Sequence, residues 1–263
     1  MARSLIGGMI NNGWPADLIH VSDPLQDQRE SLNTAFPGIH THAENAAAAA
    51  AAEIIVLAVK PQLLAEVCQS LASSIQRDTQ LIISIAAGIR STDIDRWLGG
   101  GLAIVRCMPN TPALVQSGAT GLYATPGVSE EQHNLAESIL RSVGVVLWVE
   151  DEALINAVTA VSGSGPAYIF LVIEAMEEAA VKLGLDQASA RLLSLETALG
   201  AAKLALESED DAAVLRQKVT SKGGTTEQAL RVLEEGGLRT LFADALKAAA
   251  QRANELADQL GAQ

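Results

Sequence analysis

The apolar residues in the first half of the chain form short unbroken runs, separated by segments with helical periodicity. The apolar runs predict strands at 18–22, 54–59, 81–86, 103–107 and 145–149. The segments between them predict helices at 24–33, 61–74, 91–98 and 129–143, with a short packed helix over the alanine tract 46–52. The run from Ile54 to Val59 has no polar alternation, which is typical of a strand covered on both faces. Alternating strands and helices of this kind predict an α/β fold with a doubly wound, mostly parallel sheet.

Beyond residue 151 the strand pattern stops and the rest of the chain has helical periodicity. We predict an α/β nucleotide-binding domain over 1–151 and an all-α domain over 152–263. The helices are expected at 152–160, 165–184, 187–207, 211–219, 225–235 and 238–260. They are rich in Ala and Leu and offer few large side chains for a core of their own, which favours a dimerisation bundle over an ordinary intramolecular bundle. At the boundary, Glu150, Asp151 and Glu152 are expected to form a solvated charge cluster.

Charge and composition exclude several classes of protein. The net charge of −13 argues against tight binding to nucleic acid or to anionic membranes. No run has the length and apolarity expected of a membrane span, and no signal peptide is recognisable, so we expect a soluble cytoplasmic protein. Cys68 and Cys107 are isolated in apolar surroundings, which fits a reducing compartment. No metal site is expected, and the pair His40 and His42 is interpreted as a solvated loop.

The most informative motif is AVTAVSGSGPAYIF, residues 157–170. Pro166 suits the first position of a helix, where its missing N–H is not needed. Gly163 and Gly165 permit a close approach of the backbone to another helix or to a ligand. Ser164 places a hydroxyl at the mouth of this turn. A tight packing turn between helices is the alternative interpretation.

A second Gly- and Thr-rich motif, TSKGGTT, covers residues 220–226. Thr225 and Gln228 have the spacing of a capping box, so a helix is expected to begin here. The free N–H groups of its first turn, together with Gly223 and Gly224, would bind an anion such as the carboxylate of a small substrate. A capped surface helix is the alternative. No serine–histidine–aspartate or cysteine–histidine arrangement is recognisable in the chain.

Together with Ala58-Val59-Lys60-Pro61 and with RCMPNTP, residues 106–112, these motifs resemble the pyrroline-5-carboxylate reductase family over essentially the whole chain. The resemblance implies reduction of 1-pyrroline-5-carboxylate to L-proline, the last step of proline biosynthesis. It implies NADPH as the usual reductant, with NADH possible, and homodimers that often assemble into decamers. A related 3-hydroxyacid dehydrogenase is the second hypothesis, although neither Lys182 nor Lys203 lies in a Gly-rich catalytic turn. A truncated, non-catalytic oligomeric scaffold is the third.

The resemblance also assigns roles to residues. The cofactor would lie at the carboxyl ends of the strands, on Ser22, Asp23, Asn45, Ala58, Val59, Lys60, Pro61, Ala86, Ala87, Gly88 and Asn110. Asp23 favours the ribose diol of NAD, whereas Ser22 suits a 2′-phosphate. The substrate would lie on Gly223, Gly224, Thr225 and Thr226, with Thr226 and Ser164 as catalytic residues. Two positions depart from the family pattern: Lys222 stands where proline is common, and Asn156 stands where the family has aspartate.

A sheet of this class normally opens with a strand and a Gly-rich turn that holds the pyrophosphate. Here Met1 to Ile6 has a helical pattern instead, so this first strand and its turn are missing from the sequence. A misplaced start codon is the favoured explanation, and a genuinely shortened chain is the other. In the second case two strand edges would be exposed and cofactor affinity would be lost.

Overall fold

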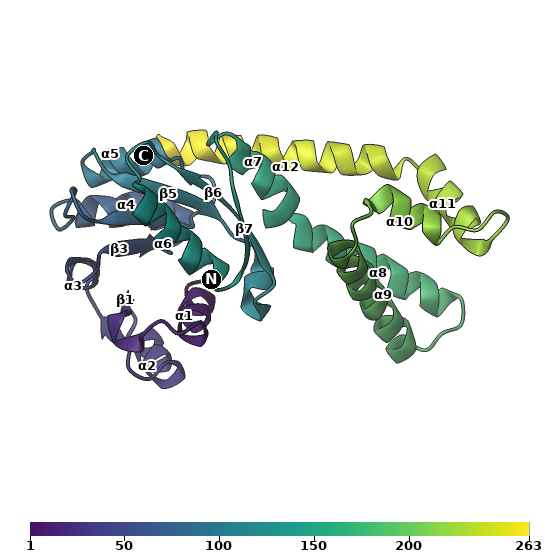
Figure 1. Cartoon of the computed structure of the whole chain (residues 1–263), viewed down its shortest axis with the longest axis horizontal. Helices are drawn as coiled ribbons and strands as arrows, with labels where there is room; N and C mark the ends of the chain where they lie inside the picture. Colours follow the sequence, from purple (N-terminus) through teal and green to yellow (C-terminus); the bar gives the residue numbers. More distant parts are fainter. Residues whose placement is uncertain (263) are drawn as a thin grey trace. The chain divides into compact units, whose positions relative to one another are not determined.

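The computed structural model describes residues 1–262, and the chain divides into two compact units. The sheet unit comprises Met1–Ser164 and the C-terminal segment from Ala248, and the helical unit comprises Gly165–Lys247 (Figure 1).

The sheet unit contains two sheets. In the smaller one, β1 (His20–Ser22) pairs in parallel with β2 (His40–His42). The larger one has five strands in chain order: β3 (Ile54–Leu57), β4 (Leu81–Ser84), β5 (Ala103–Met108), β6 (Gly118–Ala124) and β7 (Gly144–Trp148). Strands β3, β4 and β5 are parallel, whereas β6 runs antiparallel to β5 and β7 runs parallel to β6. Among the described residues, β1 and β3 each pair with a strand along one edge only.

Strands β2 and β6 are not evident from the sequence pattern. The expectation that His40 and His42 lie in a loop is wrong, because both belong to β2, a strand without any apolar run. Strand β6 reads GATGLYA, in which small residues replace the usual β-branched ones. Its direction follows from its connection: β5 and β6 are joined by only nine residues, 109–117, which is too short for the crossover that a parallel pair requires.

Helices cover both faces of the five-stranded sheet, as the apolar strands predict. On one face, α4 (Pro61–Leu71) and α5 (Ser91–Leu98) pack on Ile82 and Ile104. On the other, α1 (Ala2–Asn11) and α6 (Glu130–Arg141) pack on Ile83 and Val105. The remaining helical segments of this unit are η1 (Ala16–Leu18), α2 (Gln26–Ala35), α3 (Asn45–Ala50) and η2 (Thr111–Val115). The helix predicted over the alanine tract is therefore present as α3.

The chain leaves the sheet through α7 (Leu154–Val158), which continues into a π-helix, η3 (Thr159–Gly163). The helical unit then contains α8 (Gly165–Lys182), α9 (Gln187–Glu207), α10 (Ala212–Lys218), α11 (Thr225–Glu235) and the first part of α12 (Leu238–Gly261). These bounds agree with the sequence pattern to within two residues. The compact units, however, divide elsewhere than at residue 151. Helix α7 lies against β5 and β6, and the end of α12 buries Ala253 and Ala257 in the sheet unit.

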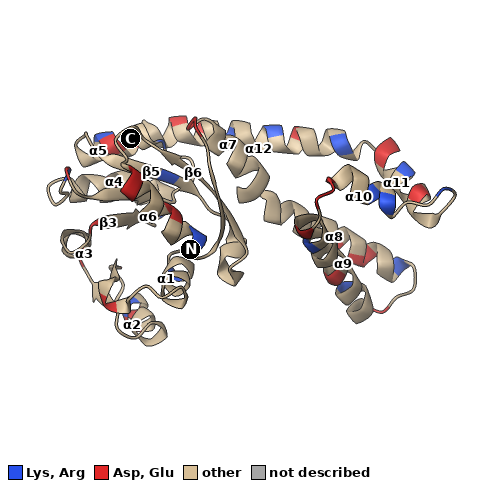
Figure 2. Cartoon of the chain, in the orientation of Figure 1, with Lys and Arg blue, Asp and Glu red and all other residues tan. Residues whose placement is uncertain are grey.

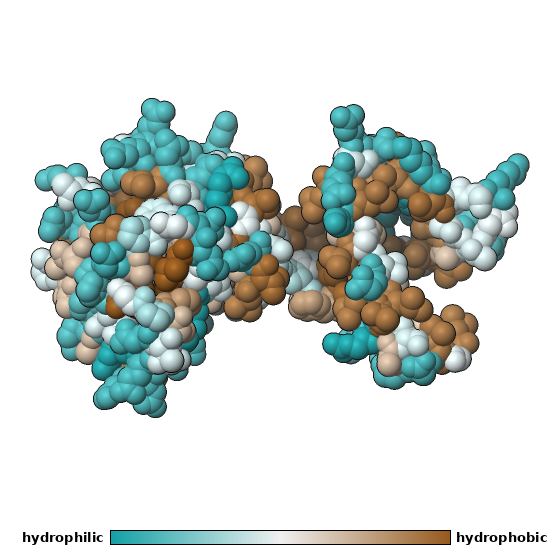
Figure 3. Space-filling view, turned by 60° about the horizontal axis from the view of Figure 1, so that its bottom comes forward, coloured by the Kyte–Doolittle hydropathy of each residue, from teal (hydrophilic) through white to brown (hydrophobic). Residues whose placement is uncertain are grey.

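The helical unit has almost no core of its own. Within it, only Ala190 and Ser194 are buried, whereas Phe170 and Leu171 on α8 are each 65% exposed and Leu199 on α9 is 62% exposed. Charged residues are scattered over both units (Figure 2), and Figure 3 shows apolar side chains gathered on the surface of the helical unit.

The expectation that no segment resembles a membrane span is wrong by length and composition, because the helical stretch Leu154–Lys182 is long and apolar enough and is mostly unburied.

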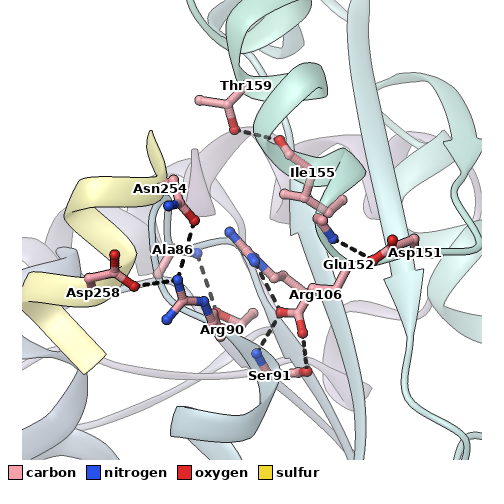
Figure 4. A network of polar contacts seen from close by, with 12 residues as sticks. Ala86, Arg90, Ser91, Arg106, Asp151, Glu152, Ile155, Thr159, Asn254 and Asp258 are labelled. Carbon is pink, nitrogen blue, oxygen red and sulfur yellow. Dashed lines mark hydrogen bonds and ion pairs between the residues drawn. The ribbon is translucent and has the colours of Figure 1, made fainter. Parts of the chain in front are cut away.

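A network of polar contacts joins β5, the start of α5 and the start of α7 (Figure 4). Arg106 Nη1 donates to Glu152 Oε1 at 3.0 Å, and the two carboxylate oxygens of Glu152 also accept from Ser91 N and Ser91 Oγ, each at 2.7 Å. The side chains of Arg106 and Glu152 are only 4% and 18% exposed. Burial lowers the pKa of the Arg106 guanidinium, and the contact with Glu152 opposes that shift. The expectation of a solvated acidic cluster is therefore wrong for Glu152, because its carboxylate neutralises a buried arginine and binds the first turn of α5.

The segment after β4 is attached to the end of α12. Arg90 Nη2 donates to Asp258 Oδ1 at 2.5 Å and to Asn254 Oδ1 at 3.3 Å. Next to it, a Cβ placed on Gly88 would lie 3.2 Å from Leu256 Cβ, so the glycine permits close packing of the loop on this helix. These contacts fix the loop that follows β4 at the carboxyl end of the sheet.

We expect Glu152→Gln to lower the free energy of unfolding by about 3 kcal/mol, because it leaves the Arg106 guanidinium buried without a countercharge. Urea denaturation followed by circular dichroism measures this. Glu150→Gln, at an exposed neighbour, is the matched control and is expected to change stability by less than about 0.5 kcal/mol. Equal midpoints for the two variants would contradict the role given to Glu152.

Both cysteines are expected to be inert in the native protein. Cys68 and Cys107 are free and buried, and burial raises the pKa of the Cys68 thiol to about 12 and that of the Cys107 thiol as well. A disulfide reagent such as dithionitrobenzoate should therefore label neither thiol at pH 8 and both in urea. Rapid labelling of the native protein would contradict this packing.

Candidate active site

The carboxyl ends of β3, β4 and β5 bring together three of the segments that the sequence assigns to the cofactor, namely residues 58–61, residues 86–88 and Asn110. Strands β3, β4 and β5 are in register through Leu57, Ser84 and Arg106, so the segments that follow them share one edge of the sheet. In open α/β sheets this edge is where ligands bind. Ser22 is the last residue of β1 in the smaller sheet, and Asp23 follows it.

Ser22 and Asn45 are in direct contact, since Ser22 Oγ donates to Asn45 Oδ1 at 2.6 Å. The carboxylate of Asp23 accepts from Leu25 N at 2.9 Å, which closes the turn leading into α2. Arg29, one turn into α2, donates through Nη1 to Asp23 O at 2.7 Å and to Pro24 O at 3.0 Å. The sequence interpretation missed Arg29. The signal for it is a basic residue one helical turn beyond the Asp-Pro pair that ends a strand.

The histidines of the smaller sheet form a cluster beside this site. His20 Nδ1 lies 3.0 Å from His42 Nε2, and the His20 ring stacks on His40 with centroids 4.6 Å apart. Burial lowers the pKa of His20, and the two neighbouring imidazoles lower it further. Among residues 1–262, no group of three or more His, Cys, Asp or Glu side chains is arranged to hold a metal ion.

At the end of β3, Ala58 and Lys60 are exposed and Val59 is half-buried. Lys60 is the N-cap residue of α4 and Pro61 occupies its first turn, as the sequence predicts. At the end of β4, Ala87 is exposed, whereas Ala86 is buried and Gly88 is packed against α12 with φ +68°. Of these three small residues assigned to the cofactor, Ala87 therefore offers the accessible surface.

Asn110 follows β5 and is 9% exposed. Its Nδ2 donates to Ser162 O at 3.1 Å, and its Oδ1 accepts from Ala119 N at 2.9 Å. Both ends of this amide are thus engaged within the protein. Ser164 lies at the end of η3, where its N–H donates to Thr159 O at 2.8 Å, and the residue is half-buried.

The residues assigned to the substrate lie in the helical unit, at the turn before α11. Helix α11 begins at Thr225, with Gly224 as its N-cap residue and no side-chain cap, so the expected capping box is wrong although the start of the helix is right. Gly223 has φ +74°, a left-handed conformation that glycine adopts readily. Its N–H donates to Glu227 Oε2 at 2.7 Å, so a carboxylate already lies on this N–H. Thr226 is half-buried and Thr225 is exposed.

Comparison with known proteins identifies the family. Residues 152–256 match the model described as pyrroline-5-carboxylate reductase dimerisation, and residues 1–88 match that of NADP oxidoreductase, coenzyme F420-dependent. The pyrroline-5-carboxylate reductase of Pseudomonas aeruginosa is 51% identical over 261 residues, which cover 99% of this chain and 95% of that protein. The match to the dimerisation domain of this family includes the whole helical unit, which agrees with the exposed apolar surface of that unit.

Solved structures give the same result. A pyrroline-5-carboxylate reductase from Coxiella burnetii is 49% identical, with a TM-score of 0.93 over 97% of this chain and 94% of that one. The pyrroline carboxylate reductase of Plasmodium falciparum with NADP bound is 26% identical, with a TM-score of 0.85 over 97% and 94% of the two chains. These similarities extend over both units and favour the reductase over the related hydroxyacid dehydrogenase. The chain is an oxidoreductase and belongs to the pyrroline-5-carboxylate reductase family.

Proposed function

We propose that this chain reduces 1-pyrroline-5-carboxylate with NADPH as its preferred reductant and NADH as the weaker one. The reaction of its family yields L-proline in the last step of proline biosynthesis, and it adds a hydride to the carbon of the C=N bond and a proton to the nitrogen. The observation that carries the proposal is 51% identity over 99% of the chain with a reductase of this name. The residues named above are consistent with this reaction in both units.

The donor set at the end of β1 fits a phosphorylated dinucleotide. Ser22 supplies a hydroxyl, Asn45 an amide and Arg29 a cation within hydrogen-bonding distance of the backbone after Ser22. An arginine near the end of this strand accommodates the 2′-phosphate of NADPH, whereas an acidic residue favours the diol of NADH. Because the Asp23 carboxylate already accepts from Leu25 N, Arg29 favours NADPH at this position. Lys60 and the exposed Ala58 and Ala87 would meet the rest of the cofactor.

The turn at residues 223–226 supports binding of the substrate carboxylate. The N–H of Gly223 binds the Glu227 carboxylate, so the turn is suited to this chemical group. We propose that the substrate carboxylate takes this place, with contributions from Gly224 and Thr225. The hydroxyl of Thr226 would then donate to or accept from the ring nitrogen.

No covalent nucleophile is needed for this reaction. Bound nicotinamide supplies the hydride, and a protonated cyclic imine is already electrophilic. The chain has to hold two rings in contact and to exclude water, which alone accounts for a large acceleration. The hydroxyls of Ser164 and Thr226 are the proposed groups that orient the imine and hold a proton near its nitrogen.

The dimerisation domain supports a homodimer, and we propose assembly into decamers. Exposed apolar residues on α8 and α9 would be covered by a second copy of the chain, which also accounts for the apolar stretch Leu154–Lys182 without a membrane. The scattered basic residues and the charge of −13 support the proposal that nucleic acid is not a partner. We place the enzyme in the cytoplasm.

The cofactor proposal predicts opposite effects for two substitutions. Arg29→Ala should raise KM for NADPH about tenfold, because it removes a charge-assisted contact, and leave KM for NADH nearly unchanged. Asp23→Ser should shift preference further toward NADPH, because it removes a negative charge near the 2′-phosphate. Oxidation of each cofactor with 1-pyrroline-5-carboxylate supplied measures both effects. Equal changes with the two cofactors would show that neither side chain faces the ribose.

The substrate proposal predicts that Thr226→Ala lowers kcat and raises KM for 1-pyrroline-5-carboxylate together, for a combined loss of about 100-fold in kcat/KM. The oligomer measured by size-exclusion chromatography should not change. Thr79→Ala removes the same groups from an exposed turn before β4 and is the control, with kinetics like those of the wild type. An unchanged kcat/KM in the Thr226 variant would refute the assigned role.

A further inference from the structure

The side chain of Asn110 connects two backbone segments that are distant in the sequence. Its amide nitrogen donates to Ser162 O at 3.1 Å in the π-helix η3, and its amide oxygen accepts from Ala119 N at 2.9 Å in β6. Ser162 Oγ reaches Ala119 O at 3.4 Å and adds a weaker link between the same segments. With 9% exposure, Asn110 is nearly enclosed by these contacts.

The partner of Asn110 is a carbonyl that a regular helix would leave unsatisfied here. In an α-helix, the carbonyl of residue 162 accepts from the N–H of residue 166. Residue 166 is a proline, which has no N–H. Asn110 therefore supplies the donor that Pro166 cannot give. The N–H of Ser164 meanwhile donates to Thr159 O, five residues back, which is the bonding pattern of a π-helix.

The π-helix η3 and the helix α7 before it approach the sheet closely at two glycines. A Cβ on Gly121 of β6 would lie 2.7 Å from Val158 Cγ1, and a Cβ on Gly163 would lie 2.5 Å from Met108 Cε of β5. Asn110 links the backbone at Ser162 to β6, and Gly163 lies against Met108 of β5. The backbone at Ser162 therefore has little freedom to move. The position of Ser164, two residues further on, follows from this anchoring.

We propose that Asn110 is a positioning residue for hydride transfer. It acts through the Ser162 carbonyl, which sets the place of the Ser164 turn at the carboxyl end of β5, and it does not itself contact the cofactor. The inference rests on the proposed function of this edge of the sheet as the active site. It replaces the sequence interpretation of Asn110 as a direct cofactor contact.

Steady-state kinetics separate the two roles. In Asn110→Ala the turn is released, so kcat is expected to fall about 10- to 100-fold, while KM and Kd for NADPH stay within about twofold of the wild type. Asn134→Ala removes the same amide from an exposed position on α6 and is the matched control, with kcat within about twofold of the wild type. A tenfold rise in Kd for NADPH with an unchanged kcat would overturn the proposal, because a lost cofactor contact produces that result.

A second substitution tests the route through the carbonyl. Pro166→Ala returns an N–H four residues after Ser162, so the double variant Asn110→Ala, Pro166→Ala should recover at least about threefold of the lost kcat. A merely structural loss at Asn110 would not be relieved by a change at residue 166. A double variant no more active than Asn110→Ala would therefore refute the assigned route.

Amide hydrogen exchange of the ligand-free chain provides a test that does not depend on activity. Asn110→Asp keeps the acceptor for Ala119 N and loses the donor to Ser162, so it also serves where the alanine variant fails to fold. Exchange at residues 159–164 should be about tenfold faster in this variant than in the wild type. Unchanged exchange would overturn the proposal. A wild-type chain that exchanges slowly here but does not oxidise NADPH with 1-pyrroline-5-carboxylate would instead contradict the proposed function.

Discussion

The burial of Arg106 in the middle of β5 is the constraint on which the architecture of the site depends. A guanidinium with 4% exposure needs a countercharge, and Glu152 supplies it from the segment that leads into α7. The same carboxylate binds the first turn of α5 through Ser91. One charge pair thereby fixes the strand, the helix after β4 and the point where the chain leaves the sheet. The loops at this edge, which carry Ala87 and Asn110, are positioned by these fixed elements.

The two units differ in how they bury their apolar side chains. The sheet unit encloses the five-stranded sheet between helices and has an apolar core on each face of that sheet. The helical unit leaves Phe170, Leu171 and Leu199 exposed and buries only Ala190 and Ser194. A surface of this kind requires a partner, and membership of a family with a dimerisation domain supplies one in a second copy of the chain. The helical unit therefore gains in assembly the core that it lacks in isolation.

Close packing at a few glycines determines how near α7, η3 and α12 lie to the sheet and its loops. Gly121 and Gly163 let α7 and η3 approach the sheet, and Gly88 lets the loop after β4 approach α12. Pro166 lies in the first turn of α8 and has no N–H to donate to the turn before it, and Asn110 replaces that donor. In this structure the Gly-Ser-Gly-Pro turn is therefore a packing turn against the sheet, whereas its role in the site stays a prediction.

Hydrophobic periodicity and the positions of Gly and Pro determined most of the helices and strands, because a buried parallel strand and a long amphipathic helix have local patterns. They place β3, β4, α5, α9 and α11 within two residues of their observed bounds, and the motifs identify the family. Contacts between distant residues have no such pattern. Only the tertiary structure decided the strand that includes His40 and His42, the pairing of Arg106 with Glu152, the place of Arg29 beside Asp23 and the return of α12 to the sheet. Each of these features depends on charges, hydrogen bonds and apolar contacts between segments that are distant in the sequence. A local sequence pattern does not contain the identity of the distant partner.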